Sequence, residues 1–246
     1  MKKHVLVICG DGINCERETA RAFEQEGGTA KILHVNEFLM QPKALLEASV
    51  FCLPGGFSFG DELRSGKILA EKMRTSLSGI FEEYLGSGGL TLGICNGFQV
   101  LIQLGAFNGI QEPRTATLAT NDHGRFWNEW VEVEITPHAS RSPWFKDMSG
   151  TLLLPARHKE GRILPKDEPS AEALCIPLRY TRPFNGAYGN AAALLDRTGR
   201  ILGMMPHPEA ATHGFLNPGL GDAAEENANR MRKLFKNALD WARSQK

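Results

Sequence analysis

The sequence predicts an α/β protein with a mostly parallel sheet, covered by helices on both faces, and an antiparallel addition in its second half. In the first hundred residues, short and mostly apolar runs alternate with longer amphipathic runs. Strands that are buried on both faces of a parallel sheet have this near-continuous apolar character. After about Pro113 turn residues become more frequent, and residues 130–135 alternate between apolar and acidic. Such alternation is typical of a half-exposed antiparallel strand.

The individual elements follow from these runs and from the turn residues between them. The apolar runs predict strands at 5–8, 31–35, 50–53, 90–92, 130–135, 151–154, 173–176, 191–195 and 201–205. The amphipathic runs predict helices at 16–25, from Pro42, and at 67–85. A last helix is expected to begin with a capping-box-like Asp222 to Glu225, and its apolar residues recur at three-to-four spacing. Because there is no internal repeat and no linker, we expect residues 1–246 to form one domain.

The composition excludes several classes of partner and location. Lys plus Arg and Asp plus Glu are both 28, so there is no basic excess of the kind that nucleic-acid or anionic-membrane binding requires. No apolar run approaches the roughly 18 residues of a membrane span. The first apolar run is too short for a signal-peptide core of about 7–15 residues. We therefore expect a cytoplasmic protein.

The five cysteines point to chemistry at one position. Their number is odd, and no two of them form a C-x-x-C pair, which argues against a disulfide framework and against a zinc ribbon. Cys9, Cys52 and Cys175 lie in or beside apolar runs, where free cysteine behaves as a small buried hydrophobe. Cys95 differs from these three, because glycines surround it.

A strand followed by Gly-x-Cys-x-Gly at 93–97 and then by a helix-compatible run has the pattern of a nucleophile elbow with cysteine in place of serine. The sharp turn imposes strained backbone angles, and the flanking glycines remove side chains that would collide. The sulfur of Cys95 would lie at a helix N-terminus, which favours the thiolate. The backbone N–H of Asn96 could then stabilise an oxyanion. A buried structural cysteine in a glycine-rich turn is the alternative.

A base for this nucleophile is expected at the end of the strand at 201–205. There, Pro-His-Pro-Glu places His207 two residues before Glu209. Such a pair can lie on one face, with the carboxylate holding one ring nitrogen and turning the other toward the sulfur. We interpret the two as base and orienting acid, and a surface turn is the alternative.

A third candidate segment follows the strand at 50–53. It reads Pro-Gly-Gly-Phe-Ser-Phe-Gly-Asp at 54–61. A glycine N–H here, at Gly55 or Gly56, would supply the second oxyanion donor beside the elbow. The alternative is a plain loop, since Pro-Gly-Gly is common in turns.

The sequence gives weaker indications of a dinucleotide site and of a metal site. Gly10-Asp11-Gly12 after the first strand suggests a dinucleotide fingerprint, but Cys15 stands where the third glycine belongs. Cys95, His207 and Glu209 could in principle bind a metal, although a catalytic zinc site normally shows a tighter ligand pattern. We expect no metal site and no cofactor in this chain, which also has no P-loop.

The three segments at 54–61, 93–99 and 203–209 together resemble the signatures of class I glutamine amidotransferases. More narrowly, they resemble the branch of that family that serves phosphoribosylformylglycinamidine synthesis in purine biosynthesis. The likeness extends to Asn-Cys-Glu-Arg-Glu at 14–18 and to Gln99, and it covers essentially the whole chain. It implies a flavodoxin-like fold, a Cys95–His207–Glu209 triad, and an oxyanion and glutamine site that includes Gly55, Gly56, Asn96 and Gln99.

The resemblance also implies partners and a substrate. The substrate would be glutamine, and the ammonia would pass to an ATP-dependent synthetase subunit that carries ATP and magnesium, with a small accessory subunit as an open option. Two segments depart from the family pattern: His-Lys-Glu-Gly at 158–161 replaces His-Gly-Glu-Gly, and Asn-Gly-Ala at 185–187 ends a stretch that tends to read Asn-Pro-Asn-Gly-Ser. We expect both near the subunit contact or the mouth of the site. The alternatives are a stand-alone cysteine hydrolase of the same fold and a non-catalytic binding module.

Overall fold

The centre of the molecule is a six-stranded, mostly parallel sheet in the order β10-β11-β4-β3-β1-β2. The computed structural model describes residues 4–62, 64–110 and 114–245. In this sheet β10 is antiparallel to β11 and the other pairs are parallel. The strands are β1 (His4–Cys9), β2 (Ala30–His34), β3 (Ala48–Leu53), β4 (Leu90–Ile94), β10 (Ala193–Leu195) and β11 (Ile201–Met204). The predicted α/β class with a mostly parallel sheet is confirmed.

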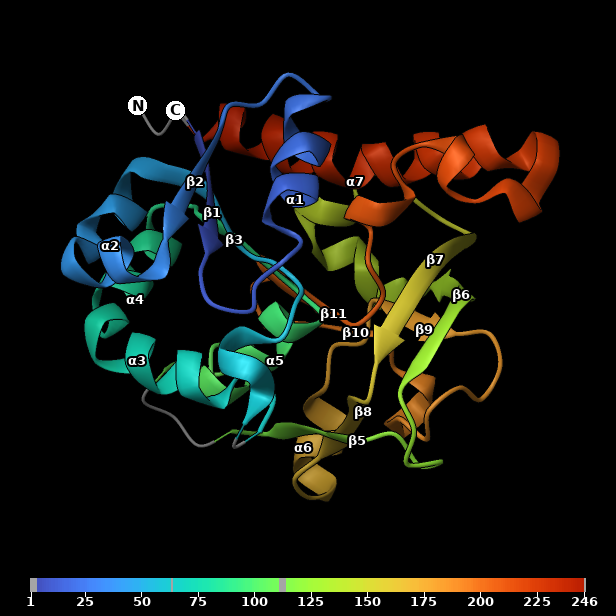
Figure 1. Cartoon of the computed structure of the whole chain (residues 1–246), viewed down its shortest axis with the longest axis horizontal. Helices are drawn as coiled ribbons and strands as arrows, with labels where there is room; N and C mark the ends of the chain where they lie inside the picture. The colour runs from blue at the N-terminus through green and yellow to red at the C-terminus, as the bar shows by residue number, and fades with distance from the viewer. Residues whose placement is uncertain (1–3, 63, 111–113, 246) are drawn as a thin grey trace.

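Helices cover both faces of this sheet. Successive residues of β1 belong to different core clusters, with Val5 and Val7 on one face and Leu6 and Ile8 on the other, as expected for a strand buried on both sides. Figure 1 shows α1 (Glu16–Glu24) and α7 (Ala224–Ser244) at the top of the view, and α2 (Val35–Met40), α3 (Lys67–Leu77) and α4 (Ile80–Gly86) at its left. The helices are α1 (Glu16–Glu24), α2 (Val35–Met40), α3 (Lys67–Leu77), α4 (Ile80–Gly86), α5 (Asn96–Leu104), α6 (Glu168–Ala173) and α7 (Ala224–Ser244). None of the helices in the described residues is long and apolar enough to cross a membrane.

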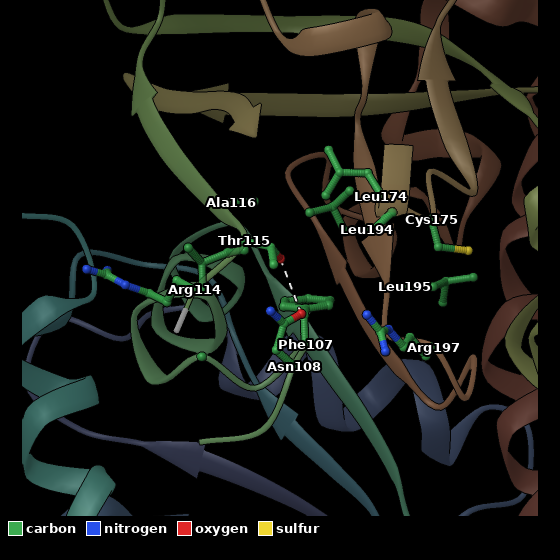
Figure 2. A pocket seen from close by; sticks show the side chains of 13 residues that line it. Phe107, Asn108, Arg114, Thr115, Ala116, Leu174, Cys175, Leu194, Leu195 and Arg197 are labelled. Atoms are coloured by element: carbon green, nitrogen blue, oxygen red, sulfur yellow. Dashed lines mark hydrogen bonds between the residues drawn. The ribbon is translucent and has the colours of Figure 1, made fainter. Parts of the chain in front are cut away.

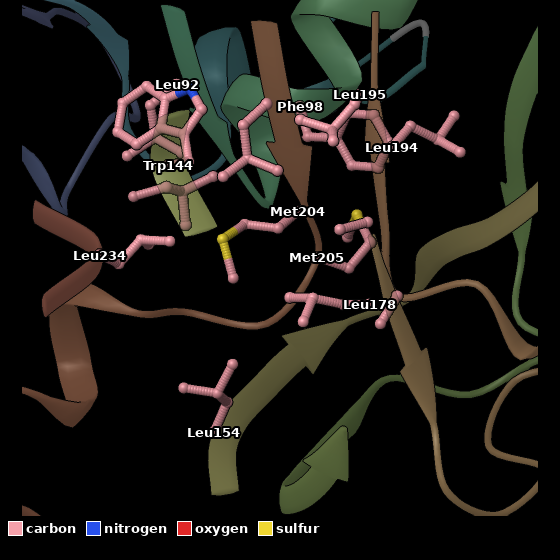
Figure 3. Packing of buried hydrophobic residues seen from close by; sticks show 14 of the residues in the cluster. Leu92, Phe98, Trp144, Leu154, Leu178, Leu194, Leu195, Met204, Met205 and Leu234 are labelled. Atoms are coloured by element: carbon pink, nitrogen blue, oxygen red, sulfur yellow. The ribbon is translucent and has the colours of Figure 1, made fainter. Parts of the chain in front are cut away.

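The second half adds antiparallel strands, as predicted. One small sheet has the order β7-β6-β9 and the other pairs β5 with β8. The strands are β5 (Ala116–Thr120), β6 (Trp127–Ile135), β7 (Thr151–His158), β8 (Glu160–Pro165) and β9 (Leu178–Tyr180). Leu154 and Leu178 from this addition pack in one cluster with Met204 of the main sheet and Leu234 of α7 (Figure 3). The antiparallel strands therefore share a core with the parallel sheet. Pro113, where the change was placed, lies outside the described residues.

Several local predictions were wrong. The helix expected at 67–85 is two helices, because Gly79 has φ +79° and starts α4 with its N–H bonded to Glu82. The strand expected at 173–176 is absent: Ala173 ends α6, and Cys175 forms only an isolated bridge to Leu195. The capping box at Asp222 is absent as well, since α7 begins at Ala224 with no side-chain cap.

Short 3-10 turns complete the chain between these elements. The helix expected from Pro42 is one of these 3-10 turns. It follows α2, which begins at Val35, the residue expected to end a strand. They are η1 (Pro42–Glu47), η2 (Ser58–Asp61), η3 (Pro137–Arg141), η4 (Pro143–Phe145), η5 (Tyr188–Asn190), η6 (Glu209–Ala211), η7 (Gly214–Leu216) and η8 (Pro218–Ala223). Sequence periodicity missed β5, β8 and β9, which are short or partly exposed.

The register of the central strands brings three strand ends to one edge. Gly93 of β4 pairs with Leu53 of β3 on one side and with Gly203 of β11 on the other. Because all three strands are parallel, the segments that follow them leave the sheet at the same edge. This is where ligands usually bind in open α/β sheets.

The first turn of α5 crosses the end of β3 at very short range. A Cβ built on Gly97 would lie 1.8 Å from the carbonyl oxygen of Leu53 and 2.4 Å from its carbonyl carbon. Only glycine allows this contact, which is between backbone atoms that cannot move aside. The position of α5 over the sheet therefore depends on Gly97.

We expect Gly97→Ala to lower the free energy of unfolding by about 1–3 kcal/mol or more, because overpacking against rigid backbone forces α5 to shift. The matched control is Gly86→Ala in α4, where a Cβ would meet nothing within 4 Å. There the change should be neutral or stabilising by up to about 1 kcal/mol. Urea titration of both variants checks the difference. Equal stabilities would contradict the tight crossing.

Candidate active site

The candidate nucleophile Cys95 occupies the junction of β4 and α5 in a strained conformation. Its φ is 49° and its ψ is −105°, a region that costs a non-glycine residue on the order of 1–3 kcal/mol. The backbone N–H of Cys95 donates to Met204 O at 2.8 Å, which fixes the turn against β11. The side chain is buried, with 6 % of its surface exposed. The expected nucleophile elbow is therefore present in geometry.

His207 and Glu209 lie beside this elbow as a buried pair. His207 Nδ1 and Glu209 Oε1 are 2.6 Å apart, and the two side chains are 5 % and 1 % exposed. The backbone N–H of His207 donates to Pro155 O at 2.8 Å, which holds the segment after β11 against β7. The second ring nitrogen, Nε2, has no hydrogen-bond partner among the described residues.

The charge of this pair follows from its surroundings. Burial alone would lower the pKa of His207, but the carboxylate of Glu209 and the nearby Cys95 sulfur outweigh it and hold the pKa well above its ordinary value. The charged imidazole is a proton donor, and it lies beside the sulfur. The pair can therefore supply a proton to a group that reacts at Cys95.

The Gly55–Gly56 turn packs against the same histidine. A Cβ on Gly55 would lie 2.7 Å from His207 Cε1, and one on Gly56 would lie 2.4 Å from Gly12 O. Gly55 O accepts hydrogen bonds from the N–H groups of Asn14 and Cys15 at 3.2 and 3.3 Å. The turn is thus clamped between the loop after β1 and the catalytic histidine candidate, where a larger residue does not fit.

Asn96 and Gln99 form a buried network instead of pointing freely into the site. Asn96 Oδ1 accepts from Ser58 N at 3.1 Å, and its Nδ2 donates to Asp61 Oδ1 at 3.0 Å and to Gln99 Oε1 at 2.9 Å. Gln99 Nε2 donates to Glu160 O at 2.5 Å. The backbone N–H of Asn96 belongs to the first turn of α5, whose amides have no partner within the helix. The side chains of Asn96 and Gln99 therefore tie the 54–61 loop and β8 to the elbow.

The loop at 54–61 needs this support. Phe59, Gly60 and Asp61 all have positive φ, at 54°, 67° and 53°. Two of the three are not glycine, so the turn carries strain that its hydrogen bonds must offset. Besides the bond from Asn96, Asp61 Oδ1 accepts from Gly66 N at 3.3 Å.

Sequence reasoning missed the contribution of the end of β7. Cys95 Sγ donates to Arg157 O at 3.5 Å, so the last residues of β7 lie directly on the sulfur. The next residue, His158, is buried with no partner for either ring nitrogen among the described residues. Burial, with the charges of His207 and His123, lowers the pKa of His158 to about 3. The segment at 158–161 thus begins at the site itself, while its changed residue, Lys159, is exposed. The only sign of this in the sequence is that the segment departs from the family pattern.

One further neighbour of the sulfur was not predicted. Tyr180 of β9 is buried, its hydroxyl has no partner among the described residues, and burial together with nearby Cys95 raises its pKa. Phe184 packs 4.6 Å from the ring of Tyr180 and 5.8 Å from that of His158. The second departure, at 185–187, follows directly, and Asn185 is 1 % exposed. Cys15, quoted in the resemblance without a role, lies close to His207 and Glu209.

A separate pocket is lined by residues of 102–116, of 173–175 and of 194–197. Figure 2 shows its lining, which includes Phe107, Cys175 and Arg197. None of the candidate catalytic residues lines it. Chemistry at Cys95 is therefore confined to the buried elbow.

Comparison with known proteins agrees with this geometry. The profile of the CobB/CobQ-like glutamine amidotransferase domain matches residues 2–242. The chain is 34 % identical to phosphoribosylformylglycinamidine synthase subunit PurQ of Dehalococcoides mccartyi, over 98 % of both chains. It is also 34 % identical to the PurQ subunit of Methanococcus maripaludis strain S2, over 96 % of both. A chain in the solved structure of PurLQS from Thermotoga maritima superposes with a TM-score of 0.77 and 27 % identity, covering 98 % of this chain and 99 % of that one.

The match spans nearly the whole chain, and it includes the elbow, the glycine turn and the His–Glu pair. The chain belongs to the CobB/CobQ-like glutamine amidotransferase family.

Proposed function

We propose that this chain is the glutaminase subunit of a phosphoribosylformylglycinamidine synthase, and that it hydrolyses glutamine through a thioester on Cys95. The observation that carries the proposal is the convergence of three strand ends on one sulfur. The elbow follows β4, the glycine turn follows β3, and His207 follows β11. Relatives that are 34 % identical and bear that enzyme's name support the assignment to this synthase.

The first half-reaction forms the thioester. The Cys95 thiolate attacks the side-chain amide carbon of glutamine, and the N–H groups of Gly56 and Asn96 hold the oxyanion. His207 donates its proton to the amide nitrogen, so that the C–N bond breaks and ammonia leaves. Each oxyanion donor is worth about 10²–10³-fold in rate, and the oriented proton transfer about 10²–10⁴-fold.

The second half-reaction restores the enzyme. His207, now neutral, takes a proton from water as the water attacks the thioester carbonyl. Glutamate leaves, and the Cys95 thiolate and the imidazolium are regenerated. Throughout, Glu209 keeps the ring oriented through the 2.6 Å contact to Nδ1, which leaves Nε2 for the reacting atoms.

The ammonia goes to a synthetase subunit that converts formylglycinamide ribonucleotide to its amidine. The match to a chain of PurLQS supports such a complex, with a synthetase and a small accessory subunit as partners. ATP and magnesium belong to the synthetase, and this chain needs no cofactor of its own for the two half-reactions.

All five cysteines are free, which fits a reducing compartment, and we assign the activity to the cytoplasm. The single domain over residues 1–246 stays a prediction.

The alternatives are less well supported. A stand-alone peptidase needs an open groove for its chain, whereas Cys95, His207 and Glu209 are each at most 6 % exposed. A non-catalytic module has no need of a strained cysteine beside a charged histidine. The elbow therefore favours turnover of a small substrate.

The test of the proposed function is Cys95→Ala in the reconstituted complex. Glutamine-dependent amidine formation should be lost, while the reaction with added ammonium should continue, because only ammonia generation depends on Cys95. The measurement is product formation with each nitrogen source. Glutamine-dependent turnover of the purified variant would refute the nucleophile, and loss of both reactions would point to a structural role instead.

The two members of the pair should differ in their effect. His207→Ala removes the proton carrier, so we expect kcat to fall by about 10²–10⁴-fold. Glu209→Gln keeps an oxygen or a nitrogen near Nδ1, so kcat should fall less in this variant. Steady-state glutaminase rates of the two variants check this order. If the alanine variant retained a rate near that of the wild type, His207 could not be the base.

Asp61 should affect kcat because it positions the loop at 54–61, which carries the oxyanion donor Gly56. Asp61→Gly accepts the φ of 53° but loses the acceptor for Asn96 and Gly66, so we expect kcat to fall by up to about 10²-fold through a misaligned donor. Asp61→Asn keeps an acceptor oxygen and should retain most of the rate. Measuring kcat and KM separately distinguishes this from weaker glutamine binding. Equal kcat values for the two variants would contradict the role.

A further inference from the structure

Cys15 has no part in the acyl transfer, yet its sulfur lies at the catalytic pair. It stands at the start of α1, and its backbone N–H donates to Gly55 O. One ligand atom from each of Cys15, His207 and Glu209 can be chosen so that all three lie within 4.8 Å of one another. The cysteine is partly exposed while the other two are buried. A thiol, an imidazole and a carboxylate thus meet at one point that solvent reaches from the side of Cys15.

Gly55 packs directly against two of these groups. A Cβ at that position would lie 2.7 Å from His207 Cε1, 3.3 Å from His207 Nδ1 and 3.4 Å from Cys15 Sγ, so the imidazole and the thiol both lie against this glycine. Glu209 Oε2 is buried and has no hydrogen-bond partner among the described residues. An unpaired buried carboxylate oxygen is costly and is available to a cation.

The ligand types select a particular class of ion. Sulfur, imidazole nitrogen and one carboxylate oxygen suit Zn²⁺ and its borderline-soft neighbours, whereas Mg²⁺ and Ca²⁺ prefer oxygen alone. Tetrahedral zinc with bonds of about 2.0–2.3 Å places its ligands about 3.5 Å apart. His207 Nδ1 and Glu209 Oε1, which are 2.6 Å apart, would need to separate by about 1 Å. The sulfur of Cys15 lies within 4.8 Å of the other two ligand atoms and would need to approach by about 1 Å.

We propose that Cys15, His207 and Glu209 form an inhibitory site for a thiophilic divalent ion such as Zn²⁺. The ion would replace the thiol proton of Cys15 and the proton between His207 Nδ1 and Glu209, and both protons would pass to solvent. A water completes the tetrahedron. With the ion on Nδ1 the ring is neutral, and giving up the Nε2 proton would leave an imidazolate. His207 is then too weak an acid to protonate the leaving nitrogen, and turnover stops until a chelator removes the ion.

Cobalt titration tests the site without relying on activity. Co²⁺ takes the place of Zn²⁺, and a thiolate ligand gives a sulfur-to-cobalt charge-transfer absorption. The wild-type chain should bind one equivalent with this absorption, and Mg²⁺ should not compete. Cys15→Ser should lose most of the absorption and bind Co²⁺ about tenfold or more weakly, because a thiolate bond is lost. The matched control is Cys175→Ser, which removes a thiol from the separate pocket and should titrate as the wild type does.

A second variant separates Cys15 from the nucleophile. Cys95→Ser should keep the charge-transfer absorption, since the sulfur ligand is Cys15. Loss of the absorption in Cys95→Ser together with a normal titration of Cys15→Ser would assign the ion to the nucleophile and overturn the proposal, as would the absence of binding to the wild-type chain. Thermal unfolding of each variant without metal confirms that it is folded. In glutaminase assays, Zn²⁺ should inhibit Cys15→Ser less than the wild type.

Discussion

The site depends on the parallel pairing of β4 with both of its neighbours. Gly93 lies between Leu53 and Gly203 in register, so the chain leaves all three strands at the same edge. A shift of one residue in either pair would turn every side chain of the shifted strand to the other face and would move one of the three catalytic segments away. The apolar, fully buried character of β3, β4 and β11 fixes this register. The positions of the reacting groups are thus set by the burial of the apolar strands that precede them in the chain.

The strained segments at this edge are costly, and the structure offsets their cost locally. Cys95, Phe59 and Asp61 all have positive φ without being glycine, each at about 1–3 kcal/mol. The side chain of Asn96 offsets part of this strain, because it accepts a hydrogen bond from Ser58 N and donates one to Asp61. The same side chain therefore supports the oxyanion loop and the elbow helix. A change on either element will therefore affect the geometry of the other.

Much of this could be predicted from sequence, because local rules govern it. The elbow at 93–97 and the pair His207 and Glu209 each follow an apolar strand, and a strand end with special residues is a local pattern. The division of the helix at Gly79 was missed because an isolated glycine does not always break a helix. The strand at 173–176 was wrong since its apolar residues are buried in an irregular segment, and periodicity cannot distinguish the two cases.

The remainder depends on contacts between distant parts of the chain. Nothing near Cys15 in sequence shows that its sulfur meets His207 and Glu209. Likewise, the carbonyl of Arg157 reaches Cys95 because β7 pairs with β6 and turns back into β8. A role of Gln99 in substrate binding stays a prediction, and the structure adds that its amide bonds Asn96 and Glu160. Tertiary packing decides such partners, and one sequence does not reveal them.

The most direct measurement of the central claim is mass spectrometry after treatment with an electrophilic glutamine analogue. If Cys95 is the nucleophile of a glutaminase, one adduct should form on the peptide that contains it, and excess glutamine should suppress the labelling. Because Cys15 is also near the histidine, its peptide serves as an internal comparison and should stay unlabelled. Labelling of Cys15 in place of Cys95, or labelling that glutamine does not suppress, would contradict the account.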